Sequence, residues 1–517
     1  MDNDSRPCLR IEQYLQQWCS LTPDAEAIVD SNRRMTYVQL KTAVDKAACL
    51  LTAHDVVDGS CVAVLAPPSI NTFISFLAAN VVGATWLGLN PKYSLAEMGH
   101  VIRDSKPTLI LAYGQIGDRS YEQDLHDICA DSAGPKQIPI HYFEVDSFSG
   151  TDEKKSHEDC FSNDLEPTNP IALFVYTSGT TGKPKAARIS HNALIHAASV
   201  RVKNWNVTPF RSINNLPINH IGSIGDIACT TLVAGGSQVC LERFSPVATL
   251  DCIQRERVSY WYQVPTMFQM CMDASETMDM DWSSLQAAIW SGGRASHVLI
   301  NRMASVAKFI AVDYSMTESV GAITLSPLTN DTSTLEDCIG WPVMVRGVRL
   351  VDPETLLPVD CGEAGEVQLF DQWMFDGYTD GVRSSDAFAS DGWFRTGDLA
   401  IQLENGSWRI VGRSKEMFKS GGYNVYPREV EMAIEMHPGV AAVAVVETKD
   451  PLYGEVGVAF VVPQGPCPDE SNLNSHCREH LANYKIPKRF VLVNELPMLP
   501  IGKVDKVALR SRAAIQD

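Results

Sequence analysis

Short apolar runs alternate with helical patterns along most of the chain. Runs such as 61–65 and 108–112 are almost wholly apolar, as expected for strands buried on both faces of a parallel sheet. Further runs of this kind lie at 171–175, 238–241, 260–264, 287–290 and 309–312. Alternation of strands and helices on this scale predicts doubly wound, layered α/β sheets. In such sheets ligands bind beyond the carboxyl ends of the strands.

The pattern changes near residues 412–415, where a smaller unit begins. Pro427 is expected to open a helix, and two apolar runs follow at 440–446 and 456–462. A helix around 477–482 and a strand at 490–493 complete the pattern. About a hundred residues of this kind are enough for a compact α+β domain.

Composition narrows the class of protein and its surroundings. The 517 residues exceed one ordinary core, so two or more domains are expected. The net charge of −19 argues against nucleic acid or anionic lipid as a main partner. The 14 cysteines include no Cys-x-x-Cys pair, which fits reduced thiols in a cytoplasmic protein.

The N-terminus is acidic and has no apolar core of a signal peptide, so no secretory signal is expected. The least polar stretch, 73–89, is short for a membrane span and contains polar residues. We interpret it as a buried helix running into a strand, and predict no stable membrane insertion. Oligomeric state is left open.

The segment after the run 171–175 has the composition of a phosphate-binding loop. Glycines let backbone N–H groups converge on an anion, hydroxyls add donors, and two lysines add charge. The loop consists of Thr177, Ser178, Gly179, Thr180, Thr181, Gly182, Lys183, Pro184 and Lys185. It is not the usual P-loop, because Pro184 stands where a Ser or Thr would bind magnesium. The alternative is a flexible glycine-serine turn without a ligand.

Further motifs follow in order and, with this loop, resemble the adenylate-forming superfamily. The superfamily comprises acyl- and aryl-CoA synthetases, stand-alone adenylation domains and beetle luciferases. The motifs are Leu216–Gly222, Trp290–Arg294, Tyr314–Glu318, Gly392–Asp398, Gly412–Lys415, Lys419–Asn424 and Leu499–Lys506. The resemblance covers nearly the whole chain. It implies that an acid and ATP form an acyl-adenylate and pyrophosphate, after which a thiol attacks the adenylate.

The resemblance assigns an ATP site. The loop would hold the β- and γ-phosphates, and Gly292 and Gly293 would let the backbone approach adenine. Tyr314 would stack on adenine, Thr317 would bind the α-phosphate, and Glu318 would bind Mg²⁺. Asp398 would accept hydrogen bonds from the ribose, assisted by Arg413. The family often has an amide or acid at the position of Val312, so Asp313, one place later, does not match it.

The same resemblance assigns the two half-reactions. His220 would flank the substrate carboxylate, and Lys503 would bridge that carboxylate and the α-phosphate. Lys415 falls at the family's hinge, which implies a domain over 1–412, a hinge at 413–416 and a small mobile domain over 417–517. Lys419, Gly421 and Gly422 would approach the thiol donor. The role of Arg294, which replaces a usual small residue, is open.

The substrate is expected to be a hydrophobic acid. Amino-acid-activating relatives place an Asp where this chain has Ile221, and an unpaired buried ammonium would be costly. Asp226 is nearby and weakens this argument. The acyl pocket is expected to include Ile221, Ile224, Gly292 and Met316, an apolar set.

The sequence therefore predicts an ATP-dependent, AMP-forming ligase that joins a carboxylic acid to coenzyme A, with Mg²⁺. One alternative is an enzyme that loads a carrier-protein phosphopantetheine, because the Lys503 motif lacks the preceding Arg or Lys common in CoA ligases. A second is a nucleotide-binding regulator without catalysis, which the joint presence of Thr317, Glu318, Asp398 and Lys503 argues against. A luciferase-like oxygenase has no positive support.

Overall fold

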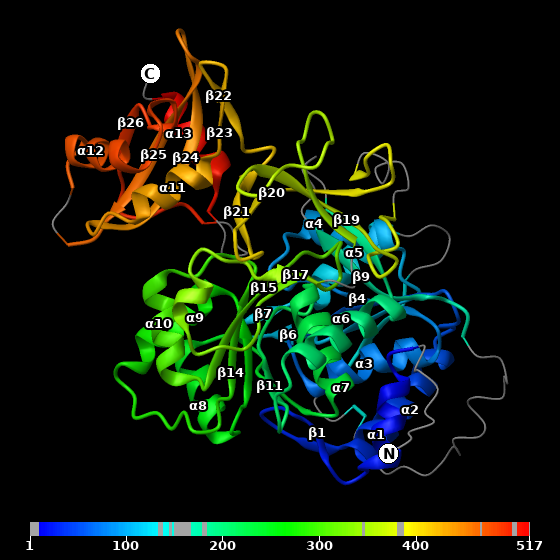
Figure 1. The fold of residues 1–517 in the computed structure, drawn as a ribbon. Coiled ribbons are helices and arrows are strands. Elements are labelled where there is room, and N and C mark those ends of the chain that lie inside the picture. Colours follow the sequence, from blue (N-terminus) through cyan, green and yellow to red (C-terminus); the bar gives the residue numbers. More distant parts are fainter. Residues whose placement is uncertain are drawn as a thin grey trace. The chain divides into compact units, whose positions relative to one another are not determined.

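The computed structural model describes most of the chain. Its described ranges are 10–132, 138–143, 147–148, 167–177, 184–343, 347–379, 387–465, 468–498 and 504–515. The chain splits into two compact units (Figure 1). The first contains Met1–Arg346 and Phe370–Phe388, and the second contains Gly347–Leu369 and Ala389–Asp517.

A nine-stranded sheet dominates the first unit. Its strand order is β17-β16-β15-β14-β13-β11-β12-β1-β2, with a parallel centre and antiparallel edges. The strands are β1 (Glu26–Val29), β2 (Arg34–Thr36), β11 (Arg211–Asn214), β12 (Ser237–Cys240), β13 (Tyr260–Gln263), β14 (Ala287–Ser291), β15 (Phe309–Ser315), β16 (Ala322–Leu325) and β17 (Trp341–Pro342).

Helices cover both faces of this sheet, as the doubly wound prediction requires (Figure 1). One face packs on α8 (Pro246–Arg255), α9 (Pro265–Ser275) and α10 (His297–Val306). The other packs on α6 (His191–Asn204) and the π-helix η2 (Gly222–Cys229), which continues into α7 (Thr230–Ala234). The face assignment follows strand alternation, since Trp261 packs in the first core and its neighbours Tyr260 and Tyr262 in the second.

A six-stranded sheet forms the other layer of the first unit, in the order β10-β9-β4-β3-β5-β8. Its strands are β3 (Cys61–Leu65), β4 (Thr85–Gly88), β5 (Leu109–Ala112), β8 (Ile140–Tyr142), β9 (Ile171–Thr177) and β10 (Lys185–Ser190). One face packs on α4 (Leu95–Ser105) and α5 (Glu122–Ser132). A small ribbon of β6 (Gln115–Ile116) and β7 (Arg119–Ser120) and the 3₁₀ turn η3 (Thr332–Leu335) complete the unit.

The N-terminal helices confirm one local prediction. The helix α2 (Tyr37–Ala53) begins with a capping box, in which Thr36 and Gln39 bond reciprocally. The helix α3 (Ile70–Val81) is buried all round and leads into β4, as expected for the apolar stretch 73–89. The first helix, α1 (Gln13–Leu21), buries Leu15.

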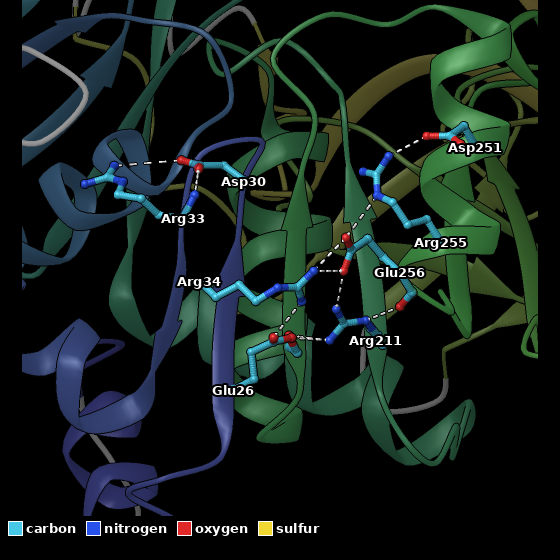
Figure 2. Close-up of polar contacts among 9 residues, drawn as sticks. Glu26, Asp30, Arg33, Arg34, Arg211, Asp251, Arg255 and Glu256 are labelled. Carbon is cyan, nitrogen blue, oxygen red and sulfur yellow. Dashed lines mark hydrogen bonds and ion pairs between the residues drawn. The ribbon is translucent and has the colours of Figure 1, made fainter.

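Charged side chains of the N-terminal strands β1 and β2 form ion pairs with residues of the central part of the large sheet and its connections (Figure 2). Arg34 of β2 donates to both carboxylate oxygens of Glu256, at 2.7 and 2.6 Å, and to Glu26 of β1 at 2.8 Å. Arg211 of β11 also donates to Glu256, at 2.9 Å, and to Glu26. A polar cavity of about 480 Å³ lies beside this network and is lined by Asp30, Ser31, Asn32, Arg33, Arg34, Arg255 and Glu256. It includes none of the residues predicted for the ATP site.

The second unit contains two sheets. A four-stranded sheet has the order β18 (Gly347–Val351), β19 (Ala364–Phe370), β20 (Phe394–Gln402) and β21 (Trp408–Arg413). The other contains β22 (Phe418–Ser420), β23 (Tyr423–Val425), β24 (Val440–Asp450), β25 (Gly454–Pro463) and β26 (Arg489–Leu492). One face of the latter packs on α11 (Pro427–Glu435) and α12 (Glu470–His480), and the other on α13 (Lys506–Ile515); η5 (Asn483–Lys485) is a short 3₁₀ turn.

Within the described ranges, no helix combines the length and apolar character that a membrane crossing needs. The cysteines described there are free thiols, and most are buried.

Candidate active site

The two ends of the predicted phosphate loop lie opposite each other. Thr177 ends β9 and Lys185 begins β10, and the two residues are paired in the antiparallel ladder. The two ends of the predicted loop are therefore held side by side at the edge of the six-stranded sheet. Ser178, Gly179, Thr180, Thr181, Gly182 and Lys183 lie outside the described residues.

Lys185 and Glu318 converge on Tyr378, a residue that no sequence motif pointed to. The Tyr378 hydroxyl donates to Glu318 Oε1 at 2.6 Å, and Lys185 Nζ lies 5.2 Å from the centre of the Tyr378 ring. A backbone bridge between Ala187 and Tyr378 places the segment that contains Tyr378 beside β10. The structure thus brings together one end of the phosphate loop and the carboxylate predicted to bind magnesium.

The motif Tyr314–Glu318 begins in the last two residues of β15 and continues past its carboxyl end, where ligands bind in open α/β sheets. The turn after the strand is closed by Ser319, whose hydroxyl accepts from Met316 N at 3.1 Å. Thr317 and Glu318 are buried, and the Glu318 carbonyl accepts from Phe375 N at 3.0 Å. The backbone and carboxylate of Glu318 are therefore both held by the segment 375–378.

Gly292 and Gly293 directly follow β14, the strand that pairs with β15. Both are exposed, and Gly292 has a φ of +77°, a conformation that favours glycine. The adjacent strand ends are linked by Ser291 and Ser315, whose hydroxyls lie 3.4 Å apart. Arg294, whose role the sequence left open, forms an ion pair with Asp337.

His220, Ile221 and Ile224 surround the start of η2. His220 is exposed, and its Nδ1 accepts from Gly222 N at 3.1 Å. In the neutral ring the proton is then on Nε2. Ile221 and Ile224 are buried, and Met316 is half-buried.

Asp226 and Asp313 both belong to one ion-pair cluster centred on Arg201. Asp226 Oδ1 lies 2.8 Å from Arg201 Nη2, and Asp313 Oδ2 lies 2.9 Å from the same nitrogen. Asp313 is thus bound on the α6 side of the sheet. It does not take the place of the amide or acid that the family has at the position of Val312.

In the second unit, Asp398 and Arg413, both predicted to lie at the ribose, form an ion pair. They lie opposite each other on β20 and β21, and Arg413 Nε is 2.9 Å from Asp398 Oδ1.

The hinge and thiol segments are also regular structures of the second unit. Lys415 lies in a turn closed by Glu416 N and Met417 N, which donate to the Arg413 carbonyl at 3.0 and 3.1 Å. Gly421 and Gly422, with φ of +58° and +87°, form the two-residue loop between β22 and β23. Positive φ at both positions is what a type I′ hairpin turn requires. Lys419 lies 3.5 Å from Glu354.

The predicted catalytic lysine, Lys503, lies outside the described residues. A bridge between Met498 and Val504 flanks its segment. Just beyond it, Lys506 bonds to Glu416 at 2.8 Å and lies 3.0 Å from Glu431. Among the residues that the structure describes, no group of three or more His, Cys, Asp or Glu side chains is arranged to hold a metal.

Comparison with known proteins identifies the family. Residues 15–379 match the AMP-binding enzyme family, and residues 429–503 match the AMP-binding enzyme C-terminal domain. Feruloyl-CoA synthase of an Amycolatopsis species is 30% identical over 502 residues, covering 95% of this chain and 96% of that protein. Indoleacetate–CoA ligase of Aromatoleum aromaticum is 29% identical, covering 98% of each chain.

A solved structure agrees in fold. ATP-bound MatB from Rhodopseudomonas palustris is 26% identical and superposes with a TM-score of 0.83, over 96% of this chain and 98% of that one. The chain belongs to the AMP-binding enzyme family, and it is an AMP-forming acid–CoA ligase that uses ATP and CoA. The predicted family, the mixed α/β fold with a large and a small domain, and the predicted enzyme class are confirmed.

Proposed function

We propose that the acid is hydrophobic and, by similarity to the feruloyl and indoleacetate ligases, aromatic. The observation that carries this is the engagement of Asp226 with Arg201, at 2.8 Å. With Ile221 in place of an acidic residue, the nearby acidic group is Asp226, which is buried against the Arg201 guanidinium and so does not serve a substrate ammonium. An α-amino acid would therefore bury its ammonium without a partner, which is costly.

We further propose how the first half-reaction is served. Thr177, Lys185 and the loop between them would hold the leaving pyrophosphate, and Thr317 would hold the α-phosphate. Tyr314 would stack on adenine, Gly292 and Gly293 would leave room for it, and Asp398 with Arg413 would bind the ribose. His220 would flank the carboxylate, and Lys503 would bridge it to the α-phosphate.

The carboxylate of Glu318 is a suitable ligand for Mg²⁺, which keeps waters and takes phosphate oxygens for the rest of its coordination. A single protein carboxylate is therefore chemically adequate, and a dedicated cluster is not needed. Mg²⁺ bound there would neutralise charge on the phosphates. Tyr378 would orient Glu318 for that task through its 2.6 Å hydrogen bond.

For the second half-reaction we propose that Lys415 is the hinge, with boundaries at 1–412, 413–416 and 417–517. Lys419, Gly421 and Gly422 would approach the pantetheine arm of CoA. A cytoplasmic location is part of the same proposal, because reduced thiols and ATP are both available there.

The testing experiment is ATP–pyrophosphate exchange with purified protein and a panel of hydroxycinnamic, arylacetic, fatty and α-amino acids. We expect the aromatic acids to support exchange and α-amino acids to give less than about a hundredth of that rate, two orders of magnitude being close to 2.7 kcal/mol. A preference for an α-amino acid would contradict the argument from Ile221 and Asp226.

The acceptor is tested in the same preparation. With the best acid, free CoA should give the thioester, and a phosphopantetheinylated carrier protein should not compete with it. A carrier protein labelled faster than CoA would favour the alternative activity.

A further inference from the structure

A fully buried group of charges joins three elements of the first unit. Arg201 comes from α6, Asp226 from η2 and Asp313 from β15. The side chains of Arg201 and Asp313 are 0% exposed, and that of Asp226 is 5% exposed. No motif of the family resemblance assigns a role to any of them.

The charges in this cluster do not balance if all three groups are ionised. One guanidinium faces two carboxylates, and a net charge buried away from water is expensive. The other titratable side chains nearby are Tyr260, Tyr262 and Cys229, and burial raises the pKa of each, so they stay neutral. Neutrality then requires a proton on one of the two carboxyl groups.

The hydrogen bonds distinguish the two carboxyl groups. Asp313 Oδ2 accepts from Arg201 Nε at 2.9 Å and from the Tyr262 hydroxyl at 3.1 Å. Arg201 also lies 5.9 Å from the centre of the Tyr262 ring. Asp226 Oδ1 lies 2.8 Å from Arg201 Nη2 but forms no hydrogen bond with it, and Asp313 Oδ1 likewise has no hydrogen-bond partner among the described residues, so the two bonds to Asp313 Oδ2 make the difference. Donors stabilise an ionised carboxylate, so the proton belongs on Asp226.

Titration of the two groups agrees with a shared proton. Burial raises the pKa of Asp226 above its ordinary range, and the attraction of Arg201 only partly offsets this. Burial and the neighbouring Asp226 likewise raise the pKa of Asp313, against the attraction of Arg201. The two carboxyl groups therefore compete for one proton, and the better hydrogen-bonded one stays ionised.

We propose that Arg201 and ionised Asp313 are positioning residues that anchor β15 for ATP binding, while Asp226 remains protonated. Asp313 directly precedes Tyr314, so its ion pair fixes the strand end on which the predicted adenine contact stands. Asp226 lies within η2, two residues after Ile224 and five after Ile221, both predicted for the acyl pocket. This inference rests on the proposed roles of Tyr314 and Ile221.

The cluster also bears on the choice of acid. A neutral carboxylic acid beside a guanidinium does not offer the negative charge that a substrate ammonium needs. The preference for hydrophobic acids would therefore have two causes, the apolar side chain of Ile221 and the lack of a negative charge on Asp226.

Two isosteric variants provide a matched test. Asp226→Asn imitates the protonated acid, so we expect its thermal midpoint and its ATP dissociation constant, measured by calorimetry, to stay within twofold of the unaltered enzyme. Asp313→Asn removes the ionised partner on β15, so we expect ATP to bind at least tenfold more weakly. Equal losses from both variants, or the larger loss from Asp226→Asn, would overturn the proposal.

The proton itself is observable by infrared spectroscopy. We expect the spectrum of the unaltered enzyme at neutral pH to contain a protonated carboxyl band that Asp226→Asn lacks; its absence from the unaltered enzyme would refute the assignment. If Asp313→Asn does not fold, Asp313→Glu replaces it, and should weaken ATP binding while keeping the infrared band. None of these measurements needs an acid substrate, so a negative pyrophosphate-exchange panel would count against the proposed function alone.

Discussion

At the scale of single residues, Tyr378 is the clearest addition to the predicted site. Its hydroxyl bonds to Glu318 and Lys185 lies over its ring, so one side chain contacts both an acidic and a basic group of the proposed ATP site. A hydrogen bond to a buried carboxylate fixes the direction in which that carboxylate faces. Tyr378 is therefore expected to matter for magnesium and ATP together.

Removing this hydroxyl gives a specific prediction. Tyr378→Phe should raise the KM for magnesium–ATP roughly tenfold, since a hydrogen bond to a charged group contributes about 1.5 kcal/mol. The KM for the acid should change little. Steady-state kinetics with each substrate varied in turn provide the measurement.

Tyr121→Phe is the matched control. The Tyr121 hydroxyl donates to the Pro91 carbonyl at 2.8 Å and belongs to none of the predicted site segments. It should leave both KM values unchanged. If Tyr378→Phe also leaves both KM values unchanged, Glu318 does not need this hydrogen bond.

The residues that sequence reasoning found and missed differ in a physical way. Tyr314, Glu318 and Asp398 lie in short contiguous motifs, where neighbouring residue types specify the chemistry. Tyr378 reaches Glu318 only through the pairing of its segment with β10, which a linear pattern does not contain. Arg201 left a fainter trace, as a charge on the buried face of α6, seven residues after Leu194.

At the scale of elements, His191 connects the start of α6 to the chain before α1. Its Nδ1 accepts from Ile11 N at 3.2 Å, so protonation of that nitrogen would break the contact. Burial and the nearby charge of Arg10 lower the pKa of His191 to about 3. Glu12 lies 3.6 Å away but is paired with Arg10, at 2.6 Å.

This buried histidine makes stability depend on pH. In the unfolded chain the ring has a pKa near 6.5, so below that pH the unfolded state takes up a proton that the folded state refuses. Its contribution to stability is present above pH 6.5 and is lost as the pH falls toward 3. At pH 5 the loss amounts to about 2 kcal/mol.

The measurement is the thermal midpoint between pH 7 and pH 4.5. His191→Gln, which cannot titrate, should show a shallower fall than the unaltered protein, even if its midpoint at pH 7 is lower. Ser190→Ala is the control, because it removes the N-cap of α6 and no titratable group, so it should lower the midpoint and leave the slope unchanged. Parallel curves for all three proteins would contradict the prediction.

Helices and strands could be predicted from the sequence where all their residues are buried to a similar degree. The central strands of the parallel sheets are continuous apolar runs because helices cover both faces, and all those named from the pattern are present. The strands β18 to β21 were not predicted, because β18 is short and only half-buried and the sheet mixes buried and half-buried positions. The π-helical form of η2 was also unforeseen, since its residues fit an ordinary buried helix equally well.

At the scale of the whole molecule, the net charge of −19 opposes the approach of ATP and CoA, which are both anionic. Binding must therefore depend on local cations, and Lys185, Arg413 and Lys503 are the ones proposed for ATP. Lys419, Gly421 and Gly422 are proposed for CoA instead. Separate groups for separate half-reactions are what an enzyme with two domain positions would need.

This division of labour can be tested by separating the half-reactions. Lys503→Ala should abolish adenylation, measured as pyrophosphate exchange, while thiolysis of supplied acyl-adenylate by CoA continues. Lys415→Pro should do the opposite, because proline fixes φ near −65° and so opposes rotation of the backbone at the proposed hinge. Each variant would then lose the half-reaction that the other retains.

Lys415→Ala separates the backbone effect from the loss of the side chain. It removes the ammonium but leaves φ free, so both half-reactions should continue in that variant. If it loses thiolysis as completely as Lys415→Pro, the side chain is needed for the chemistry and the hinge must lie elsewhere. If Lys503→Ala lowers both half-reactions equally, Lys503 does not act only on the attacking carboxylate, and one lysine would serve both positions of the small domain.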